Sequence, residues 1–186
     1  MYNEFIEACR LIQDKKISDE VKVIINILFN LFIENNALLN NFHEYYSSQL
    51  YDVVNITSII LNNPKLISQV EMFSFNFYDT FQQPDLNCQI FLSSLPSLLT
   101  SVKHIDFYSN TVGFEKKFTN IIQSQLQLSS IKIRLVETPL LESLKYSSTT
   151  LTSINFTSCF FSSTMSFDAL SHLTQLESLQ LKVVMD

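Results

Sequence analysis

The chain has 186 residues, 46% of them apolar, and a net charge of −6 at neutral pH. Its length allows one domain or one array of repeats. The acidic balance disfavours nucleic acid as a partner, because binding to phosphates needs clustered lysines and arginines. Gly113 is the only glycine, which excludes the glycine-rich loops that hold phosphates in nucleotide-binding folds.

The first predicted element is a helix that begins at residues 18–20, where Ser-Asp-Glu brings acidic side chains to the first turn. The apolar run 21–33 continues this helix. The run is shorter than the roughly 20 residues that span a bilayer, so we expect a buried core helix and no membrane contact. Residues 1–19 are of mixed polarity and do not form a secretory signal. Together with three cysteines that lack C-x-x-C spacing, this predicts an intracellular protein, cytoplasmic and/or nuclear.

Two more helices are predicted in the first half of the chain. Residues 53–61 form one that ends before Pro64, and residues 86–95 form another that ends near Pro96, because the residue before a proline avoids the helical conformation. Two short apolar segments, 39–42 and 70–75, resemble the repeated segments that follow and are expected to contribute further strands.

From residue 102 onward one hydrophobic pattern recurs: apolar, polar, polar, apolar, polar, apolar. It occurs at 102–107, 128–133, 151–156 and 176–181, with starts 26, 23 and 25 residues apart. About three such matches are expected by chance in a chain this apolar, but here the matches cluster and keep a common spacing. This is the L-x-x-L-x-L pattern and period of a leucine-rich repeat, in which each unit contributes one strand.

Helical patterns separate these strands. Pro139, behind Thr138 as N-cap, begins one helix, and Ser166 is a candidate cap for another. The apolar faces of the three helices are formed by Phe114, Phe118, Ile121, Ile122 and Leu126, by Leu140, Leu141 and Leu144, and by Phe167, Leu170 and Leu173. The ninth repeat position, commonly Asn or Cys, is filled by Asn110 and Cys159, whose side chains are expected to satisfy backbone groups in the turn after the strand.

These patterns predict a single α/β domain over residues 1–186. It would be an irregular leucine-rich-repeat-like solenoid with a parallel sheet on the concave side and helices on the convex side. Residues 1–69 would form divergent, helix-rich N-terminal units, and residues 70–186 the clearer repeats.

The polar residues between the apolar positions of each strand are expected on the concave face. Solenoids commonly bind protein partners there, and Tyr and Arg often anchor such interfaces. The alternative is a sheet face that is merely solvated. The predicted partner-binding residues are His104, Asp106, Tyr108, Lys132, Arg134, Asn155, Thr157, Gln180 and Lys182.

Catalytic chemistry has little support in the sequence. A Cys–His hydrolase would have to draw on Cys9, Cys88 or Cys159 and on His43, His104 or His172, and none stands in a recognisable nucleophile signature. The cysteines are interpreted as structural, and we expect no enzymatic activity, no metal and no cofactor.

The segment 138–181 resembles the repeat region of large fungal families of F-box proteins. The resemblance rests on Leu-Glu-Ser-Leu-Lys-Tyr at 141–146, Thr-Thr-Leu at 149–151, Phe-Asp-Ala-Leu at 167–170 and Leu-Glu-Ser-Leu at 176–179, with Phe-Ile-Glu-Asn-Asn at 32–36 upstream. It implies a receptor whose repeats hold a protein for ubiquitylation. A cullin-ligase adaptor would be a partner only if an F-box is present, and none is found, since residues 1–36 contain no proline.

A free-standing repeat scaffold and a truncated product without function are the alternatives. The chain ends directly after its last predicted strand, and a solenoid needs a polar cap over its last hydrophobic layer. We therefore expect an exposed apolar edge there, with a tendency to self-associate.

Overall fold

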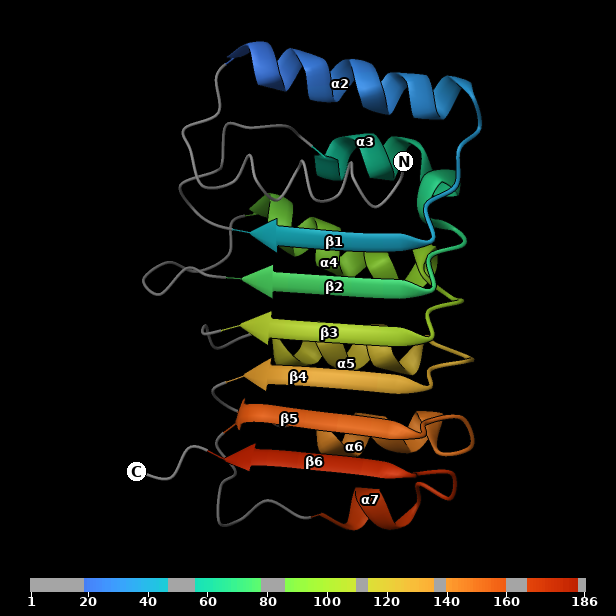
Figure 1. The fold of residues 1–186 in the computed structure, drawn as a ribbon, viewed down its shortest axis with the longest axis vertical. Helices are drawn as coiled ribbons and strands as arrows, with labels where there is room; N and C mark the ends of the chain where they lie inside the picture. The colour runs from blue at the N-terminus through green and yellow to red at the C-terminus, as the bar shows by residue number, and fades with distance from the viewer. Residues whose placement is uncertain are drawn as a thin grey trace.

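The computed structural model describes residues 19–46, 56–77, 86–109, 114–135, 140–159 and 167–183. They form an α/β fold whose strands build one parallel sheet in chain order (Figure 1). The six strands are β1 (Asn41–Tyr46), β2 (Met72–Phe77), β3 (His104–Ser109), β4 (Ser130–Leu135), β5 (Ser153–Cys159) and β6 (Ser178–Val183). Each begins two residues after the start of a hydrophobic segment identified in the sequence, so all six predicted strands are confirmed.

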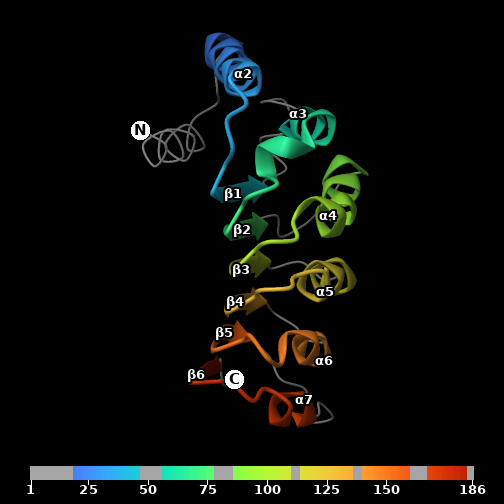
Figure 2. The same ribbon diagram turned by 90° about the vertical axis from the view of Figure 1, so that its right-hand side faces the viewer.

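One described helix precedes β1, and further helices connect the strands. They are α2 (Asp19–Glu34), α3 (Ile56–Asn62), α4 (Leu86–Leu98), α5 (Glu115–Gln123), α6 (Leu141–Leu144) and α7 (Asp168–Ser171), with 3₁₀ turns η2 (Pro64–Ile67) and η3 (Lys145–Ser147). The helices α3 to α7 line up along one face of the sheet, and α2 lies beyond β1 (Figure 2). A crossover helix between neighbouring strands is what parallel pairing requires.

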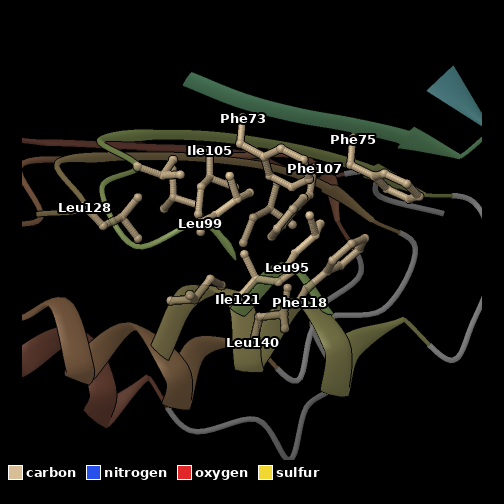
Figure 3. Close-up of a cluster of buried hydrophobic side chains, with 14 of the residues drawn as sticks. Phe73, Phe75, Leu95, Leu99, Ile105, Phe107, Phe118, Ile121, Leu128 and Leu140 are labelled. Carbon is tan, nitrogen blue, oxygen red and sulfur yellow. The ribbon is translucent and has the colours of Figure 1, made fainter. Parts of the chain in front are cut away.

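The core lies between the sheet and these helices. Figure 3 shows Phe73, Phe75, Ile105 and Phe107 directed from the strands toward helix residues such as Phe118. The rings of Phe107 and Phe118 are stacked with centroids 3.9 Å apart. Burying an aromatic side chain contributes about 1.5–3 kcal/mol relative to leaving it exposed, so these contacts are a main reason why helix and sheet stay together.

The main chain repeats one arrangement at the start of every strand after β1. The carbonyl of the residue before a strand accepts two N–H groups from the next unit, as the Lys103 carbonyl does from Ser129 and Ser130 at 2.9 and 3.0 Å. A unit here means one strand with the helix that follows it. We call these acceptors the shared carbonyls; they belong to Asn40, Glu71, Lys103, Ser129 and Thr152. They set the same register between neighbouring units although the spacing along the chain varies.

The helix α2 begins at Asp19, within the predicted start, but it is not the buried core helix that its composition indicates. Val23, Ile24 and Ile27 are each more than half exposed. Among the α2 residues whose side chains the structure describes, only Phe29 is buried, in a small cluster with Leu66. The reason is tertiary: α2 lies beyond β1, at the end of the row of helices (Figure 2), and it packs through Phe29 against Leu66. No helix in the described part of the chain is long and apolar enough to cross a membrane.

Three local predictions are also wrong. The helix α4 continues through Pro96 to Leu98, because a proline near the end of a helix removes only one late hydrogen bond. Leu126 is 79% exposed, since α5 ends at Gln123, before the apolar stripe does. Phe167 precedes the short α7 and is 42% exposed, while Leu173 is buried. The candidate caps and turn residue Thr138, Pro139, Ser166 and Asn110 lie outside the described residues.

The expected apolar edge is present in the described part of the last strand. Leu179 and Leu181 of β6 occupy core positions, in register with Ile154 and Phe156, yet they are 43% and 45% exposed.

Candidate binding surface

The face of the sheet opposite the helices is polar. Strand residues alternate between the two faces, and parallel partners in register point the same way. The buried apolar positions face the helices, so the residues between them form what we call the polar sheet face. Over β2 to β6 it comprises Met72, Ser74, Asn76, His104, Asp106, Tyr108, Ser130, Lys132, Arg134, Ser153, Asn155, Thr157, Ser178, Gln180 and Lys182. All nine residues predicted for partner binding belong to this face.

Four of the predicted residues form a charged and aromatic cluster across β3 and β4. Arg134 Nη2 donates to both carboxylate oxygens of Asp106, at 3.1 and 3.2 Å. Lys132 Nζ lies 3.5 Å from the same carboxylate, and the Arg134 guanidinium lies over the Tyr108 ring, 5.3 Å from its centroid. Two cations therefore share one anion, and the stacking and hydrogen bonds hold Arg134 in place.

A second group of predicted residues meets across β5 and β6. Asn155 Nδ2 donates to Gln180 Oε1 at 3.0 Å, and the Thr157 hydroxyl donates to Asn155 Oδ1 at 2.8 Å. Lys182 is exposed beside Thr157, its partner in register. Ser158, next in β5, has a positive φ of 56° and is skipped in the pairing, so the strand carries one extra residue there. His104 stands apart from both groups, exposed at the start of β3.

The sequence prediction missed two residues of this face, Ser74 and Asn76 in β2. They are only 5% and 2% exposed. Asn76 Nδ2 donates to Ser74 Oγ at 3.1 Å, and Asn76 Oδ1 accepts from Arg134 Nη2 at 3.4 Å. Both could have been found, since they follow Met72 at the period of two that the strand pattern sets. Ser74 and Asn76 are thus buried, whereas Gln180 and Lys182 at the β6 end of the face are exposed.

A carboxyl group occupies a core position of β1. Glu44 pairs with Phe75 in register, on the side of the sheet that faces the helices. The residue as a whole is half-buried, but burial of its carboxyl group raises the pKa of Glu44 to about 8. At neutral pH this side chain is therefore mostly uncharged in the folded protein.

The described thiols of the hydrolase hypothesis are buried, whereas its imidazoles lie on the opposite sheet face or are exposed. Cys88 and Cys159 are fully buried in the core. Cys159 is the last residue of β5, not part of a turn, and its thiol donates to the Ile133 carbonyl at 3.5 Å. His43 and His104 stand in register with residues of the polar sheet face, and His172 is exposed after α7. Cys9 lies outside the described residues. Within the described ranges, no three His, Cys, Asp or Glu side chains gather as a metal site would need.

Comparison with models of protein families, with curated proteins and with solved structures finds no match.

Proposed function

We propose that the chain is a leucine-rich-repeat-like solenoid that recognises another protein through its polar sheet face. The observation that carries the proposal is the cluster of Asp106, Lys132, Arg134 and Tyr108, a charged and aromatic group held in fixed geometry on the sheet face opposite α3 to α7. Arginine and tyrosine in such settings commonly dominate the energy of protein interfaces.

The rest of the face fits the same role. Asn155 and Thr157 on β5 and the exposed Gln180 on β6 carry hydrogen-bond donors and acceptors. Polar side chains on rigid strands lose little conformational freedom on binding, which favours recognition over a mobile loop surface. The resemblance to F-box repeat regions gives a cellular role to the same face, which would then hold a protein for ubiquitylation.

Photo-crosslinking of the full chain tests this proposal. A benzophenone amino acid is placed at Ser153 or at Gln180, both on the polar sheet face, and in a control at Lys116, an exposed residue of α5 on the helix side. After irradiation in cell extract, the two sheet positions are expected to yield an adduct with the same protein, and Lys116 none. The adduct is identified by mass spectrometry after circular dichroism has established that each variant is folded.

Equal adducts from Lys116, or different proteins from Ser153 and Gln180, would contradict binding through the sheet face. A cullin adaptor that copurifies with the chain both with and without a crosslinked partner would support the receptor role. A specific partner without any ligase component would leave recognition supported and exclude that role in the extract.

A further inference from the structure

We infer that the polar sheet face takes an acidic, extended polypeptide segment, laid diagonally across β4 to β6. This inference rests on the proposed recognition function and assigns the chemistry of the partner.

The distribution of charge is the first argument. The whole chain has 18 acidic and 12 basic residues, a net charge of −6. The polar sheet face of β2 to β6 has the opposite balance, with the cations Lys132, Arg134 and Lys182 and the single carboxylate Asp106. A positive face on a negative molecule selects for negative partners, because complementary potentials raise the rate of encounter and like charges are penalised.

The local pairing leaves this positive charge available. Asp106 is shared between Arg134 and Lys132, so it compensates only one of them. The Lys132 side chain is 42% exposed, and Lys182 is exposed two strands away. Toward β3 the Asp106 carboxylate repels a second anion, which confines an acidic ligand to the β4–β6 part of the face.

Spacing is the second argument. Lys132 is in register with Gln180, and Lys182 lies two residues further along β6. With strands about 4.8 Å apart and a rise of about 3.3 Å per residue, the two lysines are separated by roughly 12 Å along a diagonal. In an extended chain, residues four apart on the same side are about 13 Å apart. Two carboxylates at that spacing can meet both lysines, while Asn155 and Gln180 lie between them to bond the peptide backbone.

A nucleic acid is the less suitable ligand. Proteins that bind nucleic acids tightly make on the order of six to ten phosphate contacts, and this face offers three cations, two of which share Asp106. The surrounding negative charge also repels a polyanion at low salt. A short acidic segment needs only the two lysines and the polar side chains between them.

Fluorescence anisotropy of labelled peptides with the full chain tests the inference. The probe is a fluorescein-labelled peptide of alternating glutamate and serine; the control peptide has glutamine in place of glutamate. We expect binding of the glutamate peptide only. Lys132→Ala and Lys182→Ala should each weaken it about two- to fivefold, as exposed ion pairs do. Lys116→Ala removes the same charge from the helix side and should leave the affinity unchanged.

Asp106→Asn is expected to change the affinity for the glutamate peptide in the opposite direction. It removes the carboxylate that competes with the ligand, so binding of the glutamate peptide should tighten about two- to fivefold. Salt of about 1 M, where the Debye length is about 3 Å, should abolish binding. Equal affinity for the glutamine peptide, no effect of Lys132→Ala and Lys182→Ala, or tighter binding of fluorescein-labelled oligothymidylate would overturn the inference.

The crosslinking experiment separates the two proposals. A specific adduct at Ser153 and Gln180 that persists in the Lys132→Glu/Lys182→Glu protein would mean that the partner is not recognised by its charge. That result would contradict the acidic-segment inference and leave the proposed recognition function supported. Loss of the adduct in that double variant, with Lys116→Glu unaffected, would support the acidic-segment inference.

Discussion

Glu44 is the residue whose position conflicts most with its chemistry. It stands in the row of core positions that Phe75, Phe107, Ile133 and Phe156 fill in the next four strands. A carboxylate there would lose its hydration, so burial raises its pKa to about 8. The residue thus gives the folded protein a pH dependence that the exposed acidic residues do not.

The sign of that dependence follows from the proton balance. Between pH 4.5 and about 8 the folded chain keeps the Glu44 proton that the unfolded chain has lost. Unfolding therefore releases a proton, and the free energy of unfolding falls as pH rises through this window, by at most about 1.4 kcal/mol per pH unit. Glu44→Gln should flatten the profile there and raise stability most near pH 8, as measured by urea unfolding at a series of pH values.

Glu142→Gln serves as the control for this experiment. Its side chain is 63% exposed on α6 and pairs with Lys145, so the slope of stability against pH should persist in that variant. A slope that is the same in wild-type and Glu44→Gln protein would contradict the assignment to Glu44.

At the scale of elements, the joint between α4, α5 and the strands depends on Gln125. This side chain is 3% exposed. Its Nε2 donates to the carbonyls of Leu99 and Ile121 at 2.6 and 2.9 Å, and its Oε1 accepts from the Val102 N–H at 3.1 Å. One amide thus satisfies backbone groups at the end of α5 and in the segment that leads from α4 into β3.

Gln125→Ala should lower the free energy of unfolding by about 1–3 kcal/mol, because it leaves the Val102 N–H and the Leu99 carbonyl buried without that partner. Gln123→Ala, two residues earlier and exposed at the end of α5, is the matched control and should change stability by less than about 0.5 kcal/mol. Chemical denaturation of both variants measures the difference; equal effects would mean that helix propensity, not the buried amide, is responsible.

The same elements show what a sequence can and cannot predict. The strands were predicted because each set of three apolar residues, such as Val102, Ile105 and Phe107, shows which side of the strand is buried. The helix α5 was predicted because Phe114, Phe118 and Ile121 keep one helical period, but that period runs on to Leu126 after the helix has ended. Where a helix ends depends on groups such as Gln125, whose partners are 23 to 26 residues away.

For the candidate surface, the sequence likewise predicts which residues share a face but not the contacts between them. Alternation alone assigns all nine residues to one face, because register carries each strand's pattern to the next. It does not indicate that Arg134 pairs with Asp106, or that Ser74 and Asn76 are buried, since these depend on rotamers and on tertiary covering. The exposure of α2 could not be predicted for the same reason, because the apolar composition of a helix does not determine how many other elements pack against it.

At the scale of the whole molecule, packing is uneven along the row of strands. Ile105 and Phe107 in β3 are 2% and 0% exposed, and Ile131 and Ile133 in β4 are similar. The corresponding Leu179 and Leu181 in β6 are 43% and 45% exposed. Local opening costs least where few apolar contacts are lost, so the β6 end is expected to open without the middle.

Native-state hydrogen exchange measures this gradient. The hydrogen-bonded amides of β6 should exchange roughly tenfold or more faster than those of β3, a difference of about 1.4 kcal/mol or more in opening free energy. The amides of β4 should match those of β3, which makes β4 the internal control. Equal protection in β3 and β6 would instead mean that the strands open as one cooperative unit.

The shared carbonyls accept two main-chain N–H groups at every joint between neighbouring units. Side-chain hydroxyls of Ser129 and Thr152 add a bond at two of the joints, but the main-chain pair recurs at all five, so the joint depends little on which side chains meet there. Units spaced from 23 to 32 residues apart all fit it. A gene segment that encodes one unit can therefore be duplicated, lost or lengthened in frame while both flanking joints keep their register. Each such event adds or removes one strand of the polar sheet face. The width of the binding surface can therefore change by whole units, without substitution of the residues that contact the partner.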